Sequence, residues 1–213
     1  MNRKHILCYG DSNTWGYDPL GGGRYDDDAR WTERLARLLG DGFRVIAEGL
    51  NGRTTCFEDP INEGLSGLGT LAPILQSHAP LDLLVFMLGT NDCKQRFSAT
   101  PVNIKDGLLR LVQKAHGLDV WRSQPRILIV APLIMDRRLY EAPCAGGMGE
   151  GCVEKSERLP ALFEQMAREQ GLAFLDCNPY VTPVPGDYMH FDLASNAPFA
   201  AALAEKVKLL LAG

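Results

Sequence analysis

The sequence lacks the features that mark membrane-spanning, secreted and nucleic-acid-binding proteins. No apolar run approaches the roughly 20 residues that a membrane-spanning helix requires. The run nearest the amino terminus covers only Ile6 to Tyr9, which is too short for a secretory signal. Basic residues are scarce, because 22 Lys and Arg stand against 26 Asp and Glu and leave a net charge of −4. We therefore expect no membrane partner and no nucleic-acid partner.

Cysteine is present, but it lacks the spacing of a structural metal site. The six cysteines include no CxxC pair, so the zinc ribbons built on that motif are excluded. A chain of this length does not need disulfides to stabilise its core, and we expect reduced thiols and a cytoplasmic location. A disulfide between Cys144 and Cys152 stays open as an alternative, because these two cysteines flank a glycine-rich loop and are able to pair under oxidation.

The composition is otherwise that of an ordinary globular chain. Hydrophobic residues make up 46% and charged residues 23% of the 213 residues. Length divided by about 150 predicts between one and two domains. No shift in composition marks a boundary, and no internal repeat is present. The sequence therefore predicts a single domain over residues 1–213.

Short apolar runs alternate with stretches of helical periodicity along the chain. The runs show little alternation of polar and apolar residues, which indicates strands buried on both faces of a parallel sheet. They are Ile6–Tyr9, Phe43–Ala47, Leu83–Leu88, Ile127–Ala131 and Leu172–Leu175. Helices are predicted at Trp31–Leu39, Ile104–Val112, Glu154–Gln170 and Pro198–Leu211, the last with Ser195 as its N-cap. The alternation predicts a doubly wound α/β fold with right-handed crossovers.

Polar segments follow the predicted strands, at the sheet edge where such folds bind ligands. They are Gly10–Thr14 after the first strand, Glu48–Gly52 after the second and Gly89–Asp92 after the third, joined by Asp187–His190 just before the last helix. Together they supply a serine, a glycine amide, an asparagine side chain and an Asp/His pair. Acyl transfer needs these parts: a hydroxyl nucleophile, an imidazole base with an orienting carboxylate, and donors for the oxyanion.

Each of these residues also has a simpler interpretation. Ser12 suits a helix N-cap, Asp187 and His190 suit a solvated loop, and Gly52 and Asn91 suit ordinary turns. Asp11 and Asp92 are expected to brace the loops by hydrogen bonds rather than to touch substrate.

Taken in order, the segments resemble the conserved blocks of the SGNH (GDSL-type) hydrolase family. Gly10-Asp11-Ser12 is similar to the first block, with Asn13 where leucine is usual, and Gly89-Thr90-Asn91-Asp92 and Asp187-xx-His190 are similar to two others. The stretches GDSNTWGYDP, RWTERLARLLG, EGLNGRTT and MLGTNDCK resemble its arylesterase/acyltransferase branch. The resemblance implies a three-layer α/β/α sandwich with a five-stranded, mostly parallel, flavodoxin-like sheet.

The resemblance also implies an activity and a site. It implies a serine esterase that hydrolyses short-chain aryl or alkyl esters through an acyl-serine, with possible transfer to alcohols or peroxide, no cofactor, and a homo-oligomer that extends to octamers in the branch. The implied catalytic residues are Ser12, Asp187 and His190, and the implied oxyanion donors are the N–H groups of Ser12 and Gly52 and the side chain of Asn91. Asn13, Trp15 and Lys94 are expected in the substrate pocket.

Three alternatives stay open from the residues. The same triad would serve a carbohydrate O-acetyl esterase or a thioesterase. Asp11, Asp92 and His190 are potential ligands for metal-assisted hydrolysis. The loops would also suit a non-catalytic α/β ligand-binding module, although no GxGxxG or GxxxxGK[ST] motif supports phosphate binding.

Overall fold

Five parallel strands form the central sheet of the structure, a computed structural model that describes residues 3–212. Met1, Asn2 and Gly213 belong to the predicted domain but lie outside the described residues. The strands are β1 (Lys4–Gly10), β4 (Phe43–Gly49), β5 (Leu83–Met87), β6 (Ile127–Ala131) and β7 (Ala173–Asp176), and their order across the sheet is β4-β1-β5-β6-β7. This is the doubly wound, flavodoxin-like order. The predicted fold class is confirmed.

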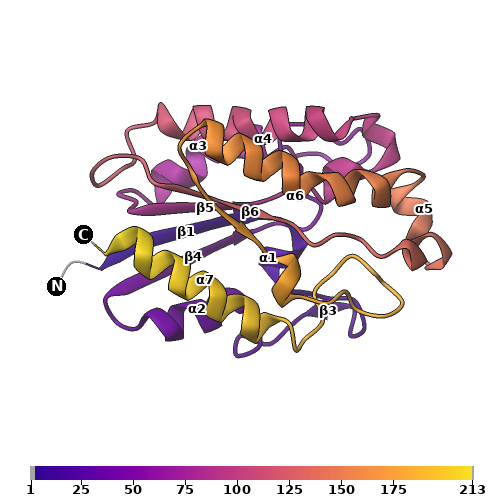
Figure 1. Ribbon diagram of the computed structural model, residues 1–213, viewed down its shortest axis with the longest axis horizontal. Coiled ribbons are helices and arrows are strands. Elements are labelled where there is room, and N and C mark those ends of the chain that lie inside the picture. The colour runs from indigo at the N-terminus through magenta and orange to yellow at the C-terminus, as the bar shows by residue number, and fades with distance from the viewer. Residues whose placement is uncertain (1–2, 213) are drawn as a thin grey trace.

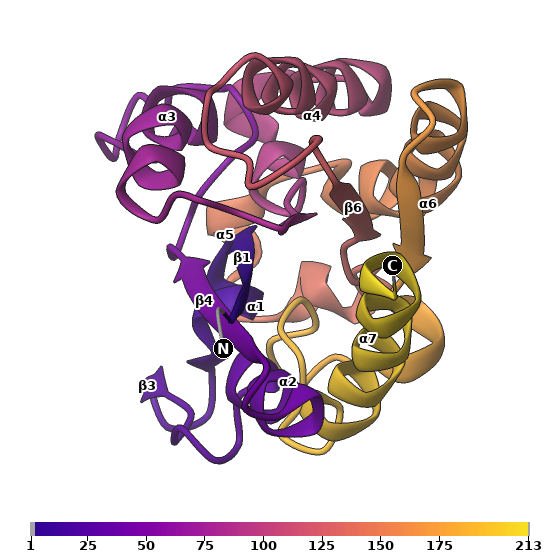
Figure 2. The ribbon, with the colours of Figure 1, turned by 90° about the vertical axis from the view of Figure 1, so that its left-hand side faces the viewer.

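Helices cover both faces of the sheet (Figures 1 and 2). On one face lie α2 (Trp31–Leu39) and α7 (Asn196–Leu211), and on the other lie α3 (Gly67–Ser77), α4 (Pro101–His116) and α6 (Cys152–Glu169). The two faces hold separate apolar cores, one around Trp31, Leu35 and Phe199 and one around Phe86 and Phe163. Because both faces are covered, the inner strands are apolar along their length, as predicted. The edge strands β4 and β7 are mostly half-buried.

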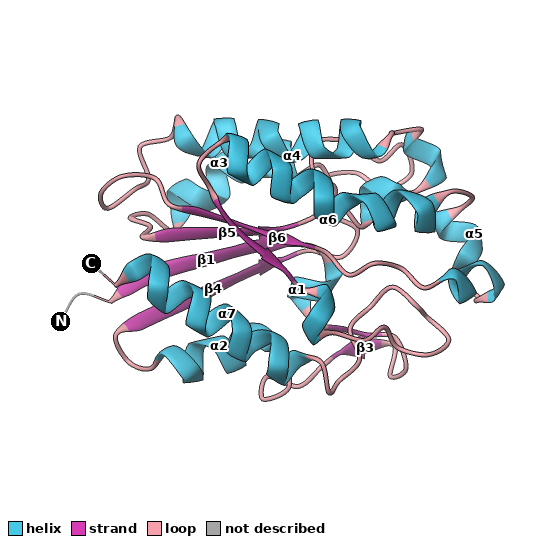
Figure 3. Ribbon diagram, viewed as in Figure 1, coloured by secondary structure: helices cyan, strands magenta, loops and turns pink. Residues whose placement is uncertain are grey.

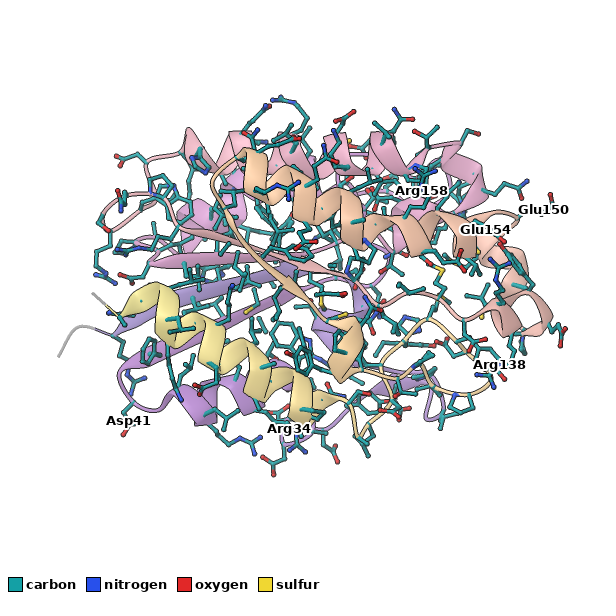
Figure 4. The ribbon with its side chains drawn as sticks, in the orientation of Figure 1. Arg34, Asp41, Arg138, Glu150, Glu154 and Arg158 are labelled. Carbon is teal, nitrogen blue, oxygen red and sulfur yellow. The ribbon has the colours of Figure 1, made fainter. Side chains whose placement is uncertain are left out.

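The side chains drawn in Figure 4 show how charged and apolar residues are distributed between the surface and the interior. The labelled charged side chains, Arg34, Asp41, Arg138, Glu150, Glu154 and Arg158, lie on the outside of the molecule, while apolar side chains fill the spaces beside the sheet. No helix within residues 3–212 combines the length and the apolar composition needed to cross a bilayer.

The carboxyl ends of the strands face the end of the molecule that carries the short elements (Figures 1 and 3). These are the helices α1 (Ser12–Trp15) and α5 (Ala145–Met148), the hairpin of β2 (Tyr17–Asp18) and β3 (Gly23–Arg24), and the 3₁₀ turns η1 (Asn91–Cys93), η2 (Gln95–Phe97), η3 (Arg137–Glu141) and η4 (Asn178–Tyr180). All polar segments singled out in the sequence come to this edge.

One predicted helix cap is wrong. Ser195 precedes α7 but has helical backbone angles and makes no side-chain bond to the helix. Its Oγ instead accepts a hydrogen bond of 2.7 Å from the N–H of Thr182. Ser195 thus fixes the loop that leads from β7 towards His190, rather than the start of the helix.

Candidate active site

Ser12 begins α1 directly behind β1, at the centre of the carboxyl edge. Asp11 caps the helix, because its Oδ1 accepts a 3.0 Å hydrogen bond from the N–H of Asn13. The sharp turn needs Gly10, since a Cβ there would lie 2.0 Å from Thr14 Oγ1 and 2.9 Å from the carbonyl oxygen of Met87. The simple interpretation of Ser12 as a cap is therefore wrong, and the Ser12 hydroxyl is left for other contacts.

The Ser12 hydroxyl meets His190, which lies 178 positions away along the chain. Ser12 Oγ is 2.8 Å from His190 Nε2, and His190 Nδ1 is 2.8 Å from Asp187 Oδ1. All three residues are more than nine-tenths buried, with 6%, 8% and 9% of their surfaces exposed for Ser12, His190 and Asp187. The chain of hydrogen bonds is thus shielded from bulk water while a small part of each group stays accessible.

Asp187 is held as an acceptor by its own loop. Its Oδ1 accepts backbone N–H groups from Met189 at 3.1 Å and from His190 at 2.8 Å, in addition to the imidazole. Burial works to raise the pKa of Asp187, but the hydrogen bonds and charge of His190 and the two backbone donors outweigh it and hold the pKa below its usual value. The carboxylate is therefore ionised around neutral pH, which suits it to orient an imidazole.

Tyr17 is a neighbour of the imidazole that the sequence analysis missed. Its ring centroid lies 4.7 Å from that of His190, and the side chain lines the same cavity. Tyr17 belongs to the two-residue strand β2, which is too short to produce a periodic signal in the sequence.

Asn13 and Trp15 do not reach the pocket in which the sequence analysis expected them. Asn13 is 5% exposed and ties α1 to the histidine loop, because its Oδ1 accepts from the N–H of Phe191 and its Nδ2 donates to the carbonyl of Met189. Trp15 packs its backbone against Gly49, and the guanidinium of Arg24 lies 4.8 Å from its ring centroid. Both residues therefore support the site from outside the cavity.

Gly52 and Asn91 line the cavity together with Ser12. Gly52 has φ +84°, and a Cβ would come within 2.8 Å of Leu65 Cδ1, so the backbone conformation itself requires glycine. The Asn91 amide is oriented by a 3.1 Å hydrogen bond from Nδ2 to the carbonyl of Arg53, which leaves its second N–H free to point elsewhere. Within residues 3–212, no acceptor engages the N–H of Ser12 or of Gly52.

Arg53 is a second residue that the sequence analysis missed. Its Nη1 donates to the carbonyl of Gly10 at 2.9 Å and also to the carbonyl of Glu48, and its guanidinium lies 4.1 Å from the ring centroid of Tyr9. Arg53 thus joins the ends of β1 and β4 to the loop that orients Asn91. An arginine in a short polar loop is usually exposed at the surface, so no signal in the sequence indicates that Arg53 is buried.

Asp11 and Asp92 brace the loops, as expected. Asp92 is fully buried and accepts from both the N–H and the hydroxyl of Thr55. The three residues considered for metal binding were Asp11, Asp92 and His190. In the structure Asp11 accepts a hydrogen bond from Asn13, and the two nitrogens of His190 form hydrogen bonds with Ser12 and Asp187. Within residues 3–212, no group of three or more His, Cys, Asp or Glu side chains is arranged to hold a metal ion.

The buried Asp92 leads to a prediction about stability. Burial raises the pKa of Asp92 from 3.8 to about 6, against the lowering effect of the Thr55 hydrogen bonds. The folded protein therefore takes up this proton at a higher pH than the unfolded chain, and the resulting stabilisation is lost as the pH rises through about 6. Asparagine cannot take up the proton. The loss of unfolding free energy in Asp92→Asn should thus be about 1 kcal/mol greater at pH 5 than at pH 7.

Urea unfolding at the two pH values measures this difference. Asp41→Asn, at an exposed position, serves as the control and is expected to show no comparable difference. An equal loss at pH 5 and pH 7 for Asp92→Asn would contradict the assignment of a buried, proton-binding carboxyl to Asp92.

A cavity of about 490 Å³ opens over these groups. It is lined by Ser12, Asp187, His190, Gly52 and Asn91, and also by Lys94, as the sequence analysis expected. The far wall comes from Pro143, Cys144, Gly147 and Met148, in the irregular segment around α5. All six cysteines are free thiols. The thiol of Cys144 donates a hydrogen bond of 3.3 Å to the carbonyl oxygen of Asp187.

Comparison with known proteins shows the family to which the chain belongs. The model of the GDSL-like lipase/acylhydrolase family matches residues 8–196. The native aryl esterase of M. smegmatis is similar at 37% identity and a TM-score of 0.90, over 98% of this chain and 100% of that chain. A carbohydrate acetylesterase family member from Sinorhizobium meliloti is similar at 38% identity and a TM-score of 0.92, over 99% and 100%.

A more distant structure shares the fold alone. A member of the lipolytic protein G-D-S-L family from Veillonella parvula has 14% identity and a TM-score of 0.65, over 95% of this chain and 97% of that chain. Comparison with curated proteins gave no match. On the family match and the aryl esterase and acetylesterase likenesses, this chain is an ester hydrolase that belongs to the GDSL-like lipase/acylhydrolase family.

Proposed function

We propose that the protein is a serine esterase that cleaves short-chain acyl esters through an acyl-serine intermediate. The observation that carries the proposal is the unbroken hydrogen-bonded series from Ser12 Oγ through His190 to Asp187, with 2.8 Å at each step. A serine hydroxyl, an imidazole and a buried carboxylate in this order form the arrangement that activates serine for attack on a carbonyl.

In the first step, His190 Nε2 removes the hydroxyl proton as Ser12 Oγ attacks the ester carbonyl. Asp187 holds the Nδ1–H tautomer and stabilises the imidazolium that forms. The tetrahedral intermediate collapses, and His190 returns its proton to the departing alcohol. In the second step, His190 takes a proton from water as the water oxygen attacks the acyl-serine. The second tetrahedral intermediate then collapses, His190 returns the proton to Ser12 Oγ, and the carboxylic acid leaves.

The oxyanion of each tetrahedral intermediate needs fixed donors. The N–H groups of Ser12 and Gly52, which have no acceptor within residues 3–212, and the second N–H of Asn91 are the donors that we assign to it. They come from the ends of β1, β4 and β5, so the sheet itself holds them in place. Donors fixed before the reaction stabilise developing charge without a cost of reorganisation.

Replacing Asn91 by alanine tests this assignment. We expect kcat for p-nitrophenyl acetate to fall by about 10²-fold to 10³-fold with a smaller change in KM, because the donor acts mainly on the transition state. Asn62→Ala, which removes an exposed amide from a nearby loop, is the control and should retain wild-type kcat. A fall in affinity alone, with kcat unchanged, would show that Asn91 binds the ground state instead.

The substrate class follows from the size of the cavity and the likeness to two kinds of esterase. A cavity of about 490 Å³ accommodates a small aryl or alkyl ester. The similarity to an aryl esterase and to a carbohydrate acetylesterase family member supports acetyl esters of phenols first and of sugars second. Acyl transfer to an alcohol or to peroxide would follow if such an acceptor replaced water in the second step.

A pre-steady-state assay tests the proposed function. Mixed with p-nitrophenyl acetate, the enzyme should release a burst of p-nitrophenolate close to one equivalent before a slower steady state, when deacylation limits turnover. Added methanol should then raise the steady rate and yield methyl acetate. Hydrolysis that is insensitive to organophosphonate but abolished by chelation would favour a metal-assisted mechanism instead.

We also propose that the protein acts as a homo-oligomer. The cavity is open to the surface, and the walls beyond the sheet edge come from short segments only, namely α5 with its flanking loop, the histidine loop and Tyr17 of β2. A second copy would narrow that opening. Size-exclusion chromatography with light scattering measures the assembly, and a monomer with a narrow substrate range would contradict this proposal.

A further inference from the structure

Lys94 adds a positively charged residue to the lining of the cavity that Ser12 also lines. It lies between η1 and η2, directly after the segment that carries Asn91, and its half-buried side chain lines the cavity together with Ser12 and His190. Within residues 3–212, the lysines whose Nζ forms a hydrogen bond or an ion pair are Lys4, Lys105, Lys114, Lys155 and Lys208, and Lys94 is not among them. Arg96 lines the same cavity and adds a second cation.

The acidic groups around Lys94 form hydrogen bonds or ion pairs with other residues, although one oxygen each of Asp11 and Asp59 has no partner within residues 3–212. Asp59 accepts from the N–H of Ile61 and lies 3.5 Å from Arg96, Asp92 is bonded to Thr55, and Asp11 to Asn13. The one carboxylate that lines the cavity, Asp187, is bonded to His190. None of these carboxylates forms a hydrogen bond or an ion pair with Lys94, whose charge they reach only at longer range.

Arg96 differs from Lys94 because its guanidinium is already used. It donates to the carbonyl of Gly147 at 2.8 Å and faces Asp59, so it fastens α5 over the cavity. Burial first, and the charge of Arg96 second, lower the pKa of Lys94, against the raising effect of Asp59 and the more distant acids. A cation that is partly removed from water and has no partner is unfavourable until an anion supplies one.

We propose that Lys94 binds an anionic group of the substrate, so that the enzyme prefers esters that carry a carboxylate over neutral esters of the same size. This inference rests on the proposed esterase function and specifies its substrate class. Lys94 is then a specificity-determining residue that pairs with a carboxylate on the alcohol part or on the acyl part of the ester. The acyl-transfer chemistry at Ser12 is unchanged, because the ion pair lies outside the atoms that react.

Two pairs of substrates test the inference and distinguish the two sides of the ester. For the alcohol side, p-acetoxybenzoate is compared with p-acetoxybenzamide, and for the acyl side, p-nitrophenyl hydrogen glutarate with p-nitrophenyl methyl glutarate. The readout is the ratio of kcat/KM for the anionic ester to that for its neutral partner. Differences in intrinsic reactivity cancel when this ratio is compared between wild type and variants.

In Lys94→Met, the ratio should fall about tenfold in at least one pair, the size expected for a hydrogen bond to a charged group. Lys94→Arg should keep most of the preference, and Lys208→Met, an exposed lysine on α7, should keep all of it. Raising the salt concentration should lower the ratio in wild type more than in Lys94→Met. Ratios that stay unchanged in both pairs would overturn the inference.

The outcome is separate from that of the esterase proposal. If Ser12→Ala kept its activity, the proposed function would fail whatever Lys94 did, whereas an unchanged ratio in an active enzyme sinks only the role of Lys94. If Lys94→Met did not fold, inhibition of the wild-type enzyme by benzoate and by benzamide would test the anion site instead. Benzoate should then compete with substrate more strongly than benzamide, and equal inhibition by the two would contradict the anion site.

Discussion

Replacing Ser12 by alanine is expected to lower kcat/KM for p-nitrophenyl acetate by about 10⁴-fold or more. The hydroxyl that lies 2.8 Å from His190 Nε2 is the atom that forms the acyl bond, and alanine offers no substitute. The activity that remains would reflect binding and the oxyanion donors acting on water alone. Steady-state kinetics with the purified variant measure the loss.

The control for this variant is Ser123→Ala, which removes an exposed hydroxyl from a loop far along the chain. It should match wild type. Circular dichroism and thermal unfolding should show that Ser12→Ala keeps the native fold, because the hydroxyl is bonded only to His190. A folded Ser12→Ala variant that retained more than about a tenth of wild-type kcat/KM would contradict nucleophilic catalysis by Ser12.

Asp187→Asn is expected to lower kcat about 10³-fold to 10⁴-fold. Asparagine keeps the size of the side chain and an oxygen for the N–H groups of Met189 and His190, so the loop should survive. It removes the negative charge that stabilises the imidazolium, however. Because Oδ1 alone accepts all three hydrogen bonds, an asparagine that keeps its oxygen there holds the loop and the imidazole in place but supplies no charge. The loss should therefore appear in kcat with little change in KM or in melting temperature.

Asp41→Asn provides the matched control, since Asp41 points outward at the surface (Figure 4). Its kinetics should equal those of wild type. Asp187→Asn kinetics within about threefold of wild type would show that His190 works without an orienting carboxylate, and the role assigned to Asp187 would then be wrong.

The sheet and its main helices could be predicted from the sequence because their signals are local. Apolar runs without alternation mark strands covered on both faces, and the predicted run Ile127–Ala131 coincides with β6. The predicted helix Trp31–Leu39 likewise has the bounds of α2. Strand β6 contributes alternate side chains to the two cores, and α2 buries one apolar face in a single core, so each signal is carried by the segment's own residues.

Helix α3 was missed because its stability comes from tertiary contacts. It contains Gly69 and Pro73, which are poor helix formers, and its Ser66 N-cap makes no side-chain bond. Leu71 and Leu75 bury one side of it completely against the sheet. Packing in this case overrides a weak local preference, and a single sequence carries no record of that packing.

The residues of the site also fall into two groups, those that a local sequence signal could place and those that only tertiary contacts position. Ser12, Gly52 and Asn91 could be placed because each follows a strand, and parallel strands bring their carboxyl ends to one edge. The roles of Arg53 and Tyr17 depend on contacts between distant loops, which no local pattern encodes. Asn13 was expected in the pocket because of its place beside Ser12, but helix geometry turns its side chain to the histidine loop.

The central claim, that Ser12 is an activated nucleophile, is tested most directly by covalent labelling. Intact-protein mass spectrometry after treatment with an activated organophosphonate should show one adduct per chain, and peptide mapping should locate it on Ser12. Esterase activity should be lost in proportion to labelling, and Ser12→Ala should remain unlabelled. An adduct on another residue, or full activity in a completely labelled enzyme, would contradict the account.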